Sequence, residues 1–143
     1  MSTEITPAHR ELAADLAAAS EPPRIVFDDV VKKFGDTTVL QDLNFSVERG
    51  ERVTLIGPSG SGKTTILRLV MTLEELTGGF IYVDGQPLTH EIRGDKRVPR
   101  KRKQVGELRK RIGMVFQQFN LFPNMTVLET VSYTHLRAHE TKA

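Results

Sequence analysis

The pattern of hydrophobic and polar positions predicts that the chain begins with β-structure. Residues 24–31 are β-branched and aromatic, and residues 39–47 place alternate hydrophobic residues such as Leu43 and Phe45 on one face, so each segment is predicted to form a strand. A turn signal at residues 34–36 separates them. The chain is therefore predicted to begin with two strands joined by a turn.

Short, continuous apolar runs further along the chain predict strands of a different kind. Residues 52–56 follow a tight turn at 48–51, and residues 112–116 form a similar run; both are typical of strands buried inside a parallel sheet. Residues 80–83 predict another strand, which ends at the hairpin signal Asp84-Gly85. Together with the helices described next, these strands predict an α/β fold.

Three segments have the signals of helices. Residues 63–75 repeat apolar residues at helical spacing. Thr126 followed by Glu129 is typical of a capped helix start. Residues 8–19 are rich in alanine and predict a frayed helix that stops before a proline pair, so residues 1–23 are expected to form a flexible tail without a function.

Composition restricts the class of protein. Of 143 residues, 38% are hydrophobic and 27% are charged, which is typical of a soluble globular domain or of part of one. The lack of cysteine excludes disulfides and cysteine-based zinc sites. The best apolar stretch, residues 66–73, contains Arg68 and is far shorter than the ~20 residues of a membrane-spanning helix, and the acidic N-terminus is unlike a secretory signal. Any role at a membrane is therefore expected to involve a partner.

The strongest motif is a glycine-rich loop between a predicted strand and a predicted helix. Its spacing lets successive backbone N–H groups point at phosphate oxygens, and the helix start adds positive charge. Lys63 is placed to reach the terminal phosphates of a nucleoside triphosphate, and the Thr64 hydroxyl to ligate Mg²⁺. This motif predicts binding of ATP with Mg²⁺ but does not identify a class of enzyme. It comprises Gly57, Pro58, Ser59, Gly60, Ser61, Gly62, Lys63 and Thr64.

Three segments, in the same order, resemble the ATP-binding subunit of ABC transporters. The loop reads GPSGSGKTT, residues 31–36 are similar to the aromatic adenine-stacking loop of that family, and residues 112–123 are similar to its glutamine loop. The resemblance covers residues 24–130 approximately. It implies a P-loop NTPase fold of the ABC ATPase type, with an N-terminal antiparallel β portion and a partial RecA-like core that is incomplete toward the C-terminus.

This resemblance also implies roles for individual residues. Phe34 would stack on adenine, and Gln117 would contact Mg²⁺ or the attacking water and relay the nucleotide state to a membrane subunit. Lys63 and Gln117 are thus the catalytic candidates, and Thr64 and Gln117 the candidate metal ligands. From the residues alone, Phe34 is also compatible with a core aromatic, and Gln117 with a solvated loop residue. The other nucleotide contacts that the family implies are Val39, residues 57–62 and Thr65.

The resemblance extends to a subfamily and its partners. Residues 116–123 are similar to the corresponding segment of importers of polar amino acids, whereas residues 70–74 and the insertion 88–111 look most like the ATPase of ectoine and hydroxyectoine uptake. Such a protein would form a homodimer of ATPase subunits bound to integral-membrane permease subunits, on the cytoplasmic face of the cell membrane. A solute-binding protein would act indirectly, and ATP hydrolysis would drive transport.

Positive charge is concentrated in residues 93–111. Ten basic and two acidic residues give this window a charge of +8, so the remainder carries −6 of the total of +2. Such a run is compatible with a solvated hairpin leading into a basic helix, with contact to an anionic membrane face, and with nucleic-acid binding. The window holds no aromatic residue to stack on bases, which makes nucleic acid the weakest of the three interpretations.

The match to the family ends near Glu129. The Leu-Ser-Gly-Gly-Gln signature, the Walker B carboxylates and the switch histidine that the family would supply do not occur in the chain. Residues 131–143 instead resemble a translated transposase-type sequencing adapter, so we expect a non-native tail fused to a truncated gene, with a natural tail as the alternative. Without the missing groups the chain is expected to bind ATP weakly and to hydrolyse it negligibly.

Other chemistry has little support in the sequence. His135 and His139 stand four residues apart beside Glu140, but no third ligand follows at a recognisable spacing, so metal binding there is rejected. His9 and His90 are isolated and are expected to be exposed to solvent. Two other functions compete with an importer ATPase: a small-molecule P-loop kinase, which leaves the aromatic and glutamine motifs unexplained, and a nucleic-acid-associated ABC ATPase.

Overall fold

The computed structural model describes residues 4–116 and 126–129. The chain divides into two units, residues 1–113 and 114–143, and the elements below belong to the first unit unless stated otherwise. Gln117 and the predicted tail at 131–143 lie outside the described residues. The predicted boundary at residue 130 stays a prediction, whereas residues 7–18 of the predicted flexible tail form a capped helix with two buried residues, so the expectation of flexibility is wrong there. No helix in the described ranges combines the length and the hydrophobicity that crossing a membrane requires.

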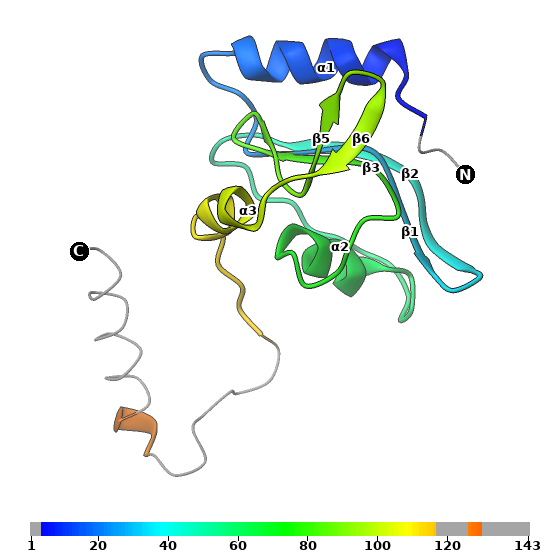
Figure 1. Cartoon of the computed structure of the whole chain (residues 1–143). Helices are drawn as coiled ribbons and strands as arrows, with labels where there is room; N and C mark the ends of the chain where they lie inside the picture. Colours follow the sequence, from blue (N-terminus) through cyan, green and yellow to red (C-terminus); the bar gives the residue numbers. More distant parts are fainter. Residues whose placement is uncertain (1–3, 117–125, 130–143) are drawn as a thin grey trace. The chain divides into compact units, whose positions relative to one another are not determined.

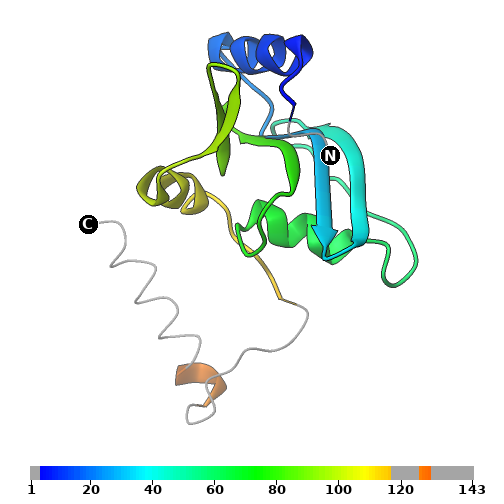
Figure 2. The ribbon, with the colours of Figure 1, turned by 45° about the vertical axis from the view of Figure 1, so that its right-hand side comes forward.

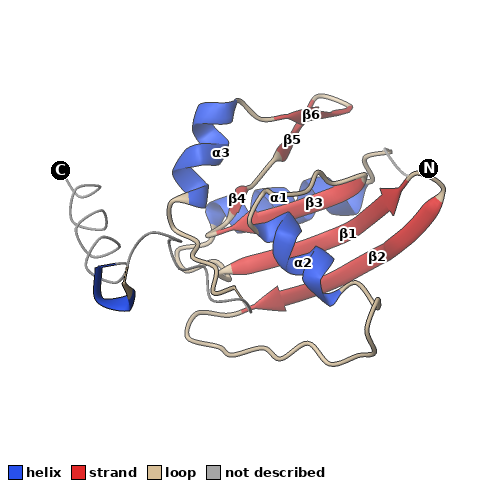
Figure 3. Ribbon diagram, turned by 90° about the horizontal axis from the view of Figure 1, so that it is seen from below, coloured by secondary structure: helices blue, strands red, loops and turns tan. Residues whose placement is uncertain are grey.

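A four-stranded antiparallel sheet forms the centre of the first unit. Its strands are β1 (Ile25–Phe34), β2 (Thr37–Val47), β3 (Gly78–Val83) and β4 (Gln86–Pro87), in the spatial order β2-β1-β3-β4. Strand β1 pairs with β2 through the predicted turn and with β3 on its other edge (Figure 3). The sequence prediction of an antiparallel β portion is therefore confirmed.

Both faces of the sheet are covered, each by a different helix. Helix α1 (Pro7–Ala18) lies on one face and α2 (Lys63–Val70) on the other (Figures 1 and 2). Because neighbouring strand residues point to opposite faces, Phe80 and Tyr82 of β3 pack with Leu16 of α1, whereas Ile81 and Val83 join the core that includes Leu69 of α2. This two-sided burial explains why every residue of β3 is buried.

Helix α2 ends earlier than the sequence predicts. Its last residue is Val70, whereas helical periodicity continues to residue 75. Thr72 has a left-handed φ of +57°, and the backbone N–H of Leu73 bonds to the carbonyl of Arg68 at 2.9 Å. This is the Schellman arrangement that terminates helices, here with a β-branched residue where glycine is usual. The apolar spacing alone does not reveal that backbone change.

Two of the predicted strands are not formed. Residues 52–56 and 112–116 have no regular secondary structure, and Ile56 and Val115 are 92% and 98% exposed. A strand of a parallel sheet is held by backbone hydrogen bonds to neighbouring strands. In the part of the chain that the structure describes, the sheets offer no such neighbour to either segment. The prediction of two buried parallel strands is therefore wrong for this structure.

The basic insertion folds as a hairpin followed by a helix, as predicted. Strands β5 (His90–Arg93) and β6 (Lys96–Pro99) pair with each other, and α3 (Arg102–Arg109) follows them. Not all of its charge is solvated. Arg97 donates from Nε to the carbonyl of Gly79 at 2.8 Å, and Arg100 donates to the carbonyl of Pro87, so both side chains are turned toward the main sheet.

His90 is partly buried, and the prediction that it would be solvent-exposed is wrong. Its Nδ1 lies 3.0 Å from the Thr89 hydroxyl. Burial lowers its pKa to about 4, and the positive charge of Arg97 contributes to the decrease. The cause is the β5–β6 hairpin, which folds His90 against the rest of the unit. The isolated position of His90 in the sequence does not indicate this long-range effect.

Replacing Gly79 with alanine is predicted to destabilise the fold severely. Gly79 has a φ of +73°, and an added Cβ would lie 2.2 Å from the carbonyl oxygen of Asp29. Gly94 is a matched control, because its φ of +59° is also left-handed but nothing lies within 4 Å of an added Cβ. Chemical denaturation should show a loss of at least about 3 kcal/mol for Gly79→Ala against about 1 kcal/mol for Gly94→Ala. Equal losses would contradict the close approach of β1 and β3.

Lowering the pH is predicted to destabilise the protein through His90. The unfolded chain protonates this residue near pH 6.5 and the folded chain only near pH 4. Stability is therefore lost as the pH falls through that window and is fully present above it. In urea denaturation, His90→Gln should reduce the difference in unfolding free energy between the two ends of the window. An unchanged difference would contradict the burial of this imidazole.

Candidate functional site

The phosphate loop, residues 57–62, curls in the way that its glycines predict. Gly60 and Gly62 have φ values of +81° and +91°, a left-handed conformation that other residues rarely adopt. Within the curl, the backbone N–H of Ser61 donates to the carbonyl of Pro58 at 3.2 Å. Gly57 and Gly60 are exposed. The loop is therefore open to a ligand from solvent.

Lys63 closes the loop from its C-terminal end. Its Nζ donates to the carbonyls of Gly57 and Pro58, at 2.6 and 2.7 Å, and to the Ser61 hydroxyl at 3.2 Å. All three acceptors are uncharged, so they do not neutralise the ammonium group. The full positive charge of Lys63 is held beside the curled backbone, where it favours an anion.

The start of helix α2 supplies the other half of an anion site. Gly62 is the N-cap and has no side chain with which to cap the helix, and the first intrahelical bond runs from the N–H of Ile66 to the carbonyl of Gly62 at 3.0 Å. The N–H groups of the first turn are therefore available to a ligand. Thr64 is exposed there and Thr65 is partly buried. A hydroxyl, an ammonium and backbone amides together fit a magnesium-bound polyphosphate.

The loop is anchored to the sheet at one point. A Cβ added to Gly62 would lie 2.9 Å from Leu40 Cδ2 and 3.2 Å from Val39 Cγ1, so β2 packs directly against this glycine. The structure thus brings together two predicted site residues, Val39 and Gly62. Phe34 stands at the end of the same β1–β2 hairpin, 45% exposed, with Lys32 Nζ 4.4 Å from its ring centroid. The role of Phe34 in stacking on adenine stays a prediction.

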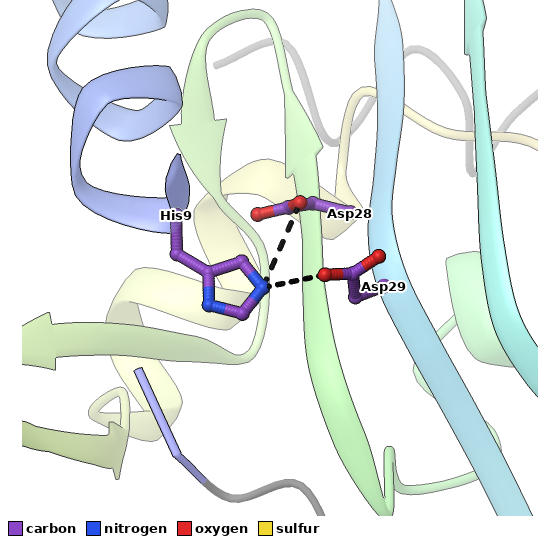
Figure 4. Close-up of side chains that lie close together, drawn as sticks. All are labelled: His9, Asp28 and Asp29. Atoms are coloured by element: carbon purple, nitrogen blue, oxygen red, sulfur yellow. Dashed lines mark hydrogen bonds and ion pairs between the residues drawn. The ribbon is translucent and has the colours of Figure 1, made fainter. Parts of the chain in front are cut away.

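The structure also contains a cluster of titratable side chains that was not predicted, formed by His9, Asp28 and Asp29 (Figure 4). His9 Nε2 lies 3.0 Å from Asp29 Oδ2 and 3.9 Å from Asp28 Oδ1. Consecutive strand residues normally point to opposite faces, but Asp29 has a φ of +47° within a bulge of β1, which turns both carboxylates toward His9. His9 is 5% exposed, so its predicted exposure to solvent is wrong.

The environments of the two carboxylates differ. Burial is the main cause that raises the pKa of Asp28, whose Oδ2 is buried without a hydrogen-bond partner among the described residues. The pKa of Asp29 is lowered, mainly by the side-chain amide of Asn44, which donates to Oδ1 at 2.7 Å. A buried carboxylate beside a histidine is a common feature of metal sites, so the histidine tautomer decides the chemistry.

Hydrogen bonding indicates that this cluster holds α1 on β1, an arrangement called the latch below, and argues against a metal site. The backbone N–H of Thr6 donates to His9 Nδ1 at 3.0 Å as part of a capping box, so the proton of the neutral ring is on Nε2. A metal at Nε2 would require the proton on Nδ1, where it would face the Thr6 N–H. Two features signalled the cluster in the sequence: Thr6 and His9 have capping-box spacing, and an Asp28-Asp29 pair interrupts an apolar strand.

Comparison with known proteins gives consistent matches. The family model described as ABC transporter matches residues 40–143. A protein of Sinorhizobium fredii named as a probable amino-acid ABC transporter ATP-binding protein is 53% identical over 76% of this chain and 42% of its own length. The general L-amino acid transport ATP-binding protein AapP of Rhizobium johnstonii is 48% identical over 68% of this chain and 34% of its own.

A third relative is also named for amino-acid transport. The glutamine transport ATP-binding protein GlnQ of Escherichia coli is 44% identical over 79% of this chain and 43% of its own length. The chain thus spans about two fifths or less of the length of these curated relatives. The matched region includes the phosphate loop and the segment around Gln117.

Replacing His9 with alanine is predicted to cost about 2 kcal/mol of unfolding free energy, because it removes the bond to Asp29 and one bond of the capping box. Asp95→Asn is the matched control, because Asp95 also binds α1, through Arg10, but is exposed, and it should change stability little. Chemical denaturation measures both. Addition of Zn²⁺ should not raise the melting temperature of the parent; a rise that His9→Ala abolishes would contradict the latch.

Proposed function

Because the chain belongs to the ABC transporter family, we propose that its phosphate loop binds ATP with Mg²⁺ and that the intact protein is the energy-coupling ATPase of an importer. The observation that carries the proposal is the convergence of three groups on one point: the left-handed glycines, the Lys63 ammonium and the uncapped start of α2. Each is a donor or a positive charge, and together they suit a polyphosphate.

The individual roles follow from the chemistry of these groups. Lys63 exchanges its bonds to the loop carbonyls for bonds to phosphate oxygens, and Thr64 offers a hydroxyl to Mg²⁺, as Gln117 would from the segment after residue 116. Mg²⁺ held by these groups would supply positive charge against the negative charge that develops on the phosphate oxygens. Phe34 lies on the hairpin that touches Gly62, and its exposed ring is available to adenine.

The solute is proposed to be polar and amino-acid-like. Three relatives that are named for amino-acid or glutamine transport support this class. Within it, we propose ectoine or hydroxyectoine as the candidate to test first, on the resemblance of the insertion 88–111 alone. Genes beside the native gene would decide: a solute-binding protein with a pocket for another ligand class argues against that choice.

The proposed partners are a second ATPase subunit and integral-membrane permease subunits, at the cytoplasmic face of the membrane, with a solute-binding protein acting indirectly. Nucleic acid is a weaker candidate partner. Arg97 and Arg100 of the basic insertion are bound to backbone carbonyls and are not presented to solvent as a phosphate-binding row. A small-molecule kinase has no observation in its favour among the described residues.

We propose further that this 143-residue chain does not turn over ATP by itself. Phosphoryl transfer depends on several positioned groups, and the described part of the phosphate loop provides only the cradle and one cation. The strand segment before the loop, residues 52–56, is not built into a sheet, so that side of the cradle lacks support. Steady-state phosphate release by this chain would contradict the proposal.

Replacing Lys63 with alanine is predicted to weaken the binding of Mg·ATP by roughly ten- to a hundredfold, because a charge-assisted contact worth about 1.5–3 kcal/mol is lost. Calorimetric titration of the full chain measures the change. Lys96→Ala is the matched control: it removes the same charge from an exposed position on β6 and should leave the affinity unchanged. Equal affinities of the Lys63→Ala variant and the parent would disprove the proposed site.

A further inference from the structure

A second cationic site lies away from the phosphate loop. A cavity of about 560 Å³ opens where the end of α1 meets the turn between β3 and β4. Its neutral lining includes Leu16, Ser20 and Gln86. Its charged lining consists of three arginines and one aspartate: Arg24, Arg49, Arg111 and Asp84. These four residues come from four separate parts of the sequence.

The three guanidinium groups converge on the single carboxylate. Arg24 Nη1 lies 2.8 Å and Arg49 Nη2 lies 3.4 Å from Asp84 Oδ1, while Arg111 Nη1 lies 3.5 Å from Oδ2. Asp84 is nearly buried, with 10% of its side chain exposed, whereas each arginine is about half exposed. Asp84 therefore forms the floor of the cluster, and the arginines present their remaining N–H donors to the cavity.

The charges of this cluster do not balance. Three cations face one anion, and the other lining residues carry no charge, so two positive charges are in excess. Like charges a few ångströms apart repel one another unless an anion lies between them. The guanidinium groups also have more N–H donors than one carboxylate can accept. An entering dianion would satisfy both the charge and the donors.

Backbone hydrogen bonds fix the positions of Asp84 and Arg24 in this cluster. The N–H of Asp84 donates to the carbonyl of Arg24 at 3.0 Å, and the N–H of Arg24 donates to the carbonyl of Val47 at 2.8 Å. Gly85 leaves no room for a side chain, because an added Cβ would lie 2.6 Å from the carbonyl oxygen of Leu16. A cluster held in this way loses little conformational entropy when an anion binds.

We propose that this cavity binds a phosphate-type dianion through Arg24, Arg49 and Arg111. The excess of two charges matches the dianion of a phosphate monoester near neutral pH. Planar guanidinium groups bind phosphate oxygens in pairs, which favours this ligand over a halide or a single carboxylate. The source is either a free phosphate compound or the phosphomonoester headgroup of a lipid, and these share the same chemistry.

Titration with inorganic phosphate at about pH 8, where it is a dianion, tests the proposal. The full chain carries Lys63→Ala, so that the phosphate loop contributes little, and the ionic strength is kept constant with chloride. In calorimetry, Arg49→Gln with Arg111→Gln should weaken binding at least about tenfold. The matched control, Arg52→Gln with Arg93→Gln, removes the same charge from exposed positions outside this cavity and should have no such effect.

One further variant separates a binding site from a structural ion pair. Asp84→Asn removes the one negative charge of the cavity and should tighten phosphate binding several-fold, provided that circular dichroism shows a folded chain. The proposal is overturned if the Lys63→Ala chain binds no phosphate, if both arginine pairs weaken binding equally, or if Asp84→Asn leaves binding unchanged. None of these outcomes depends on whether the phosphate loop binds ATP.

Vesicles distinguish the two sources of the ligand. Phosphatidylcholine vesicles containing phosphatidic acid present a phosphomonoester, and those containing phosphatidylglycerol present a phosphodiester. Binding to the first kind only, lost in the double variant of Arg49 and Arg111, identifies a lipid headgroup. Phosphate binding without any vesicle binding identifies a free compound. Equal binding to both kinds of vesicle indicates attraction by net charge and contradicts a built site.

Discussion

Strand β1 is the element on which the rest of the described structure depends. It pairs with β2 and β3 on its two edges, and its neighbouring residues Val26 and Phe27 belong to cores on opposite faces of the sheet. Its polar side chains hold the segments that cover those faces: Asp29 binds His9 of α1, and Lys32 donates to the carbonyl of Glu75 after α2. A buried strand tolerates such groups only because each has partners.

Because the sheet built on β1 holds the neighbouring segments, only one end of the phosphate loop is fixed. The loop is fixed at Gly62, which packs against β2, and α2 behind it is held on the sheet by Leu69. The entering segment, residues 52–56, has no such support. A loop with one fixed end must be ordered at the expense of binding free energy, which lowers the affinity for any ligand. The donors and the positive charge of the loop are therefore in place, while the segment that enters it is not held by a sheet among the described residues.

Predictions from the sequence succeeded where the physical cause is local. The turns at residues 34–36 and at Asp84-Gly85 follow from the backbone preferences of the residues themselves, and so does the curl of the phosphate loop. They failed where the cause is a distant partner. Residues 52–56 have the composition of a strand but no neighbouring strand in the part of the chain that is described, and His9 is buried by a bulge 20 residues away. The spacing of hydrophobic residues shows which face of a helix or strand is apolar, but it does not show which other segment packs against that face.

The two cationic sites differ in a way that their residue types explain. Lys63 is a flexible point charge bonded to uncharged oxygens, so it can exchange those partners for phosphate oxygens at little electrostatic cost and return when the product leaves. The arginines around Asp84 are planar and fixed by a nearly buried carboxylate that stays in place when a ligand arrives. A site of the first kind suits a ligand that is turned over. A site like the arginine cluster suits a ligand that stays bound. Phosphate bound there would therefore stabilise the junction of α1, β3 and β4 without taking part in hydrolysis.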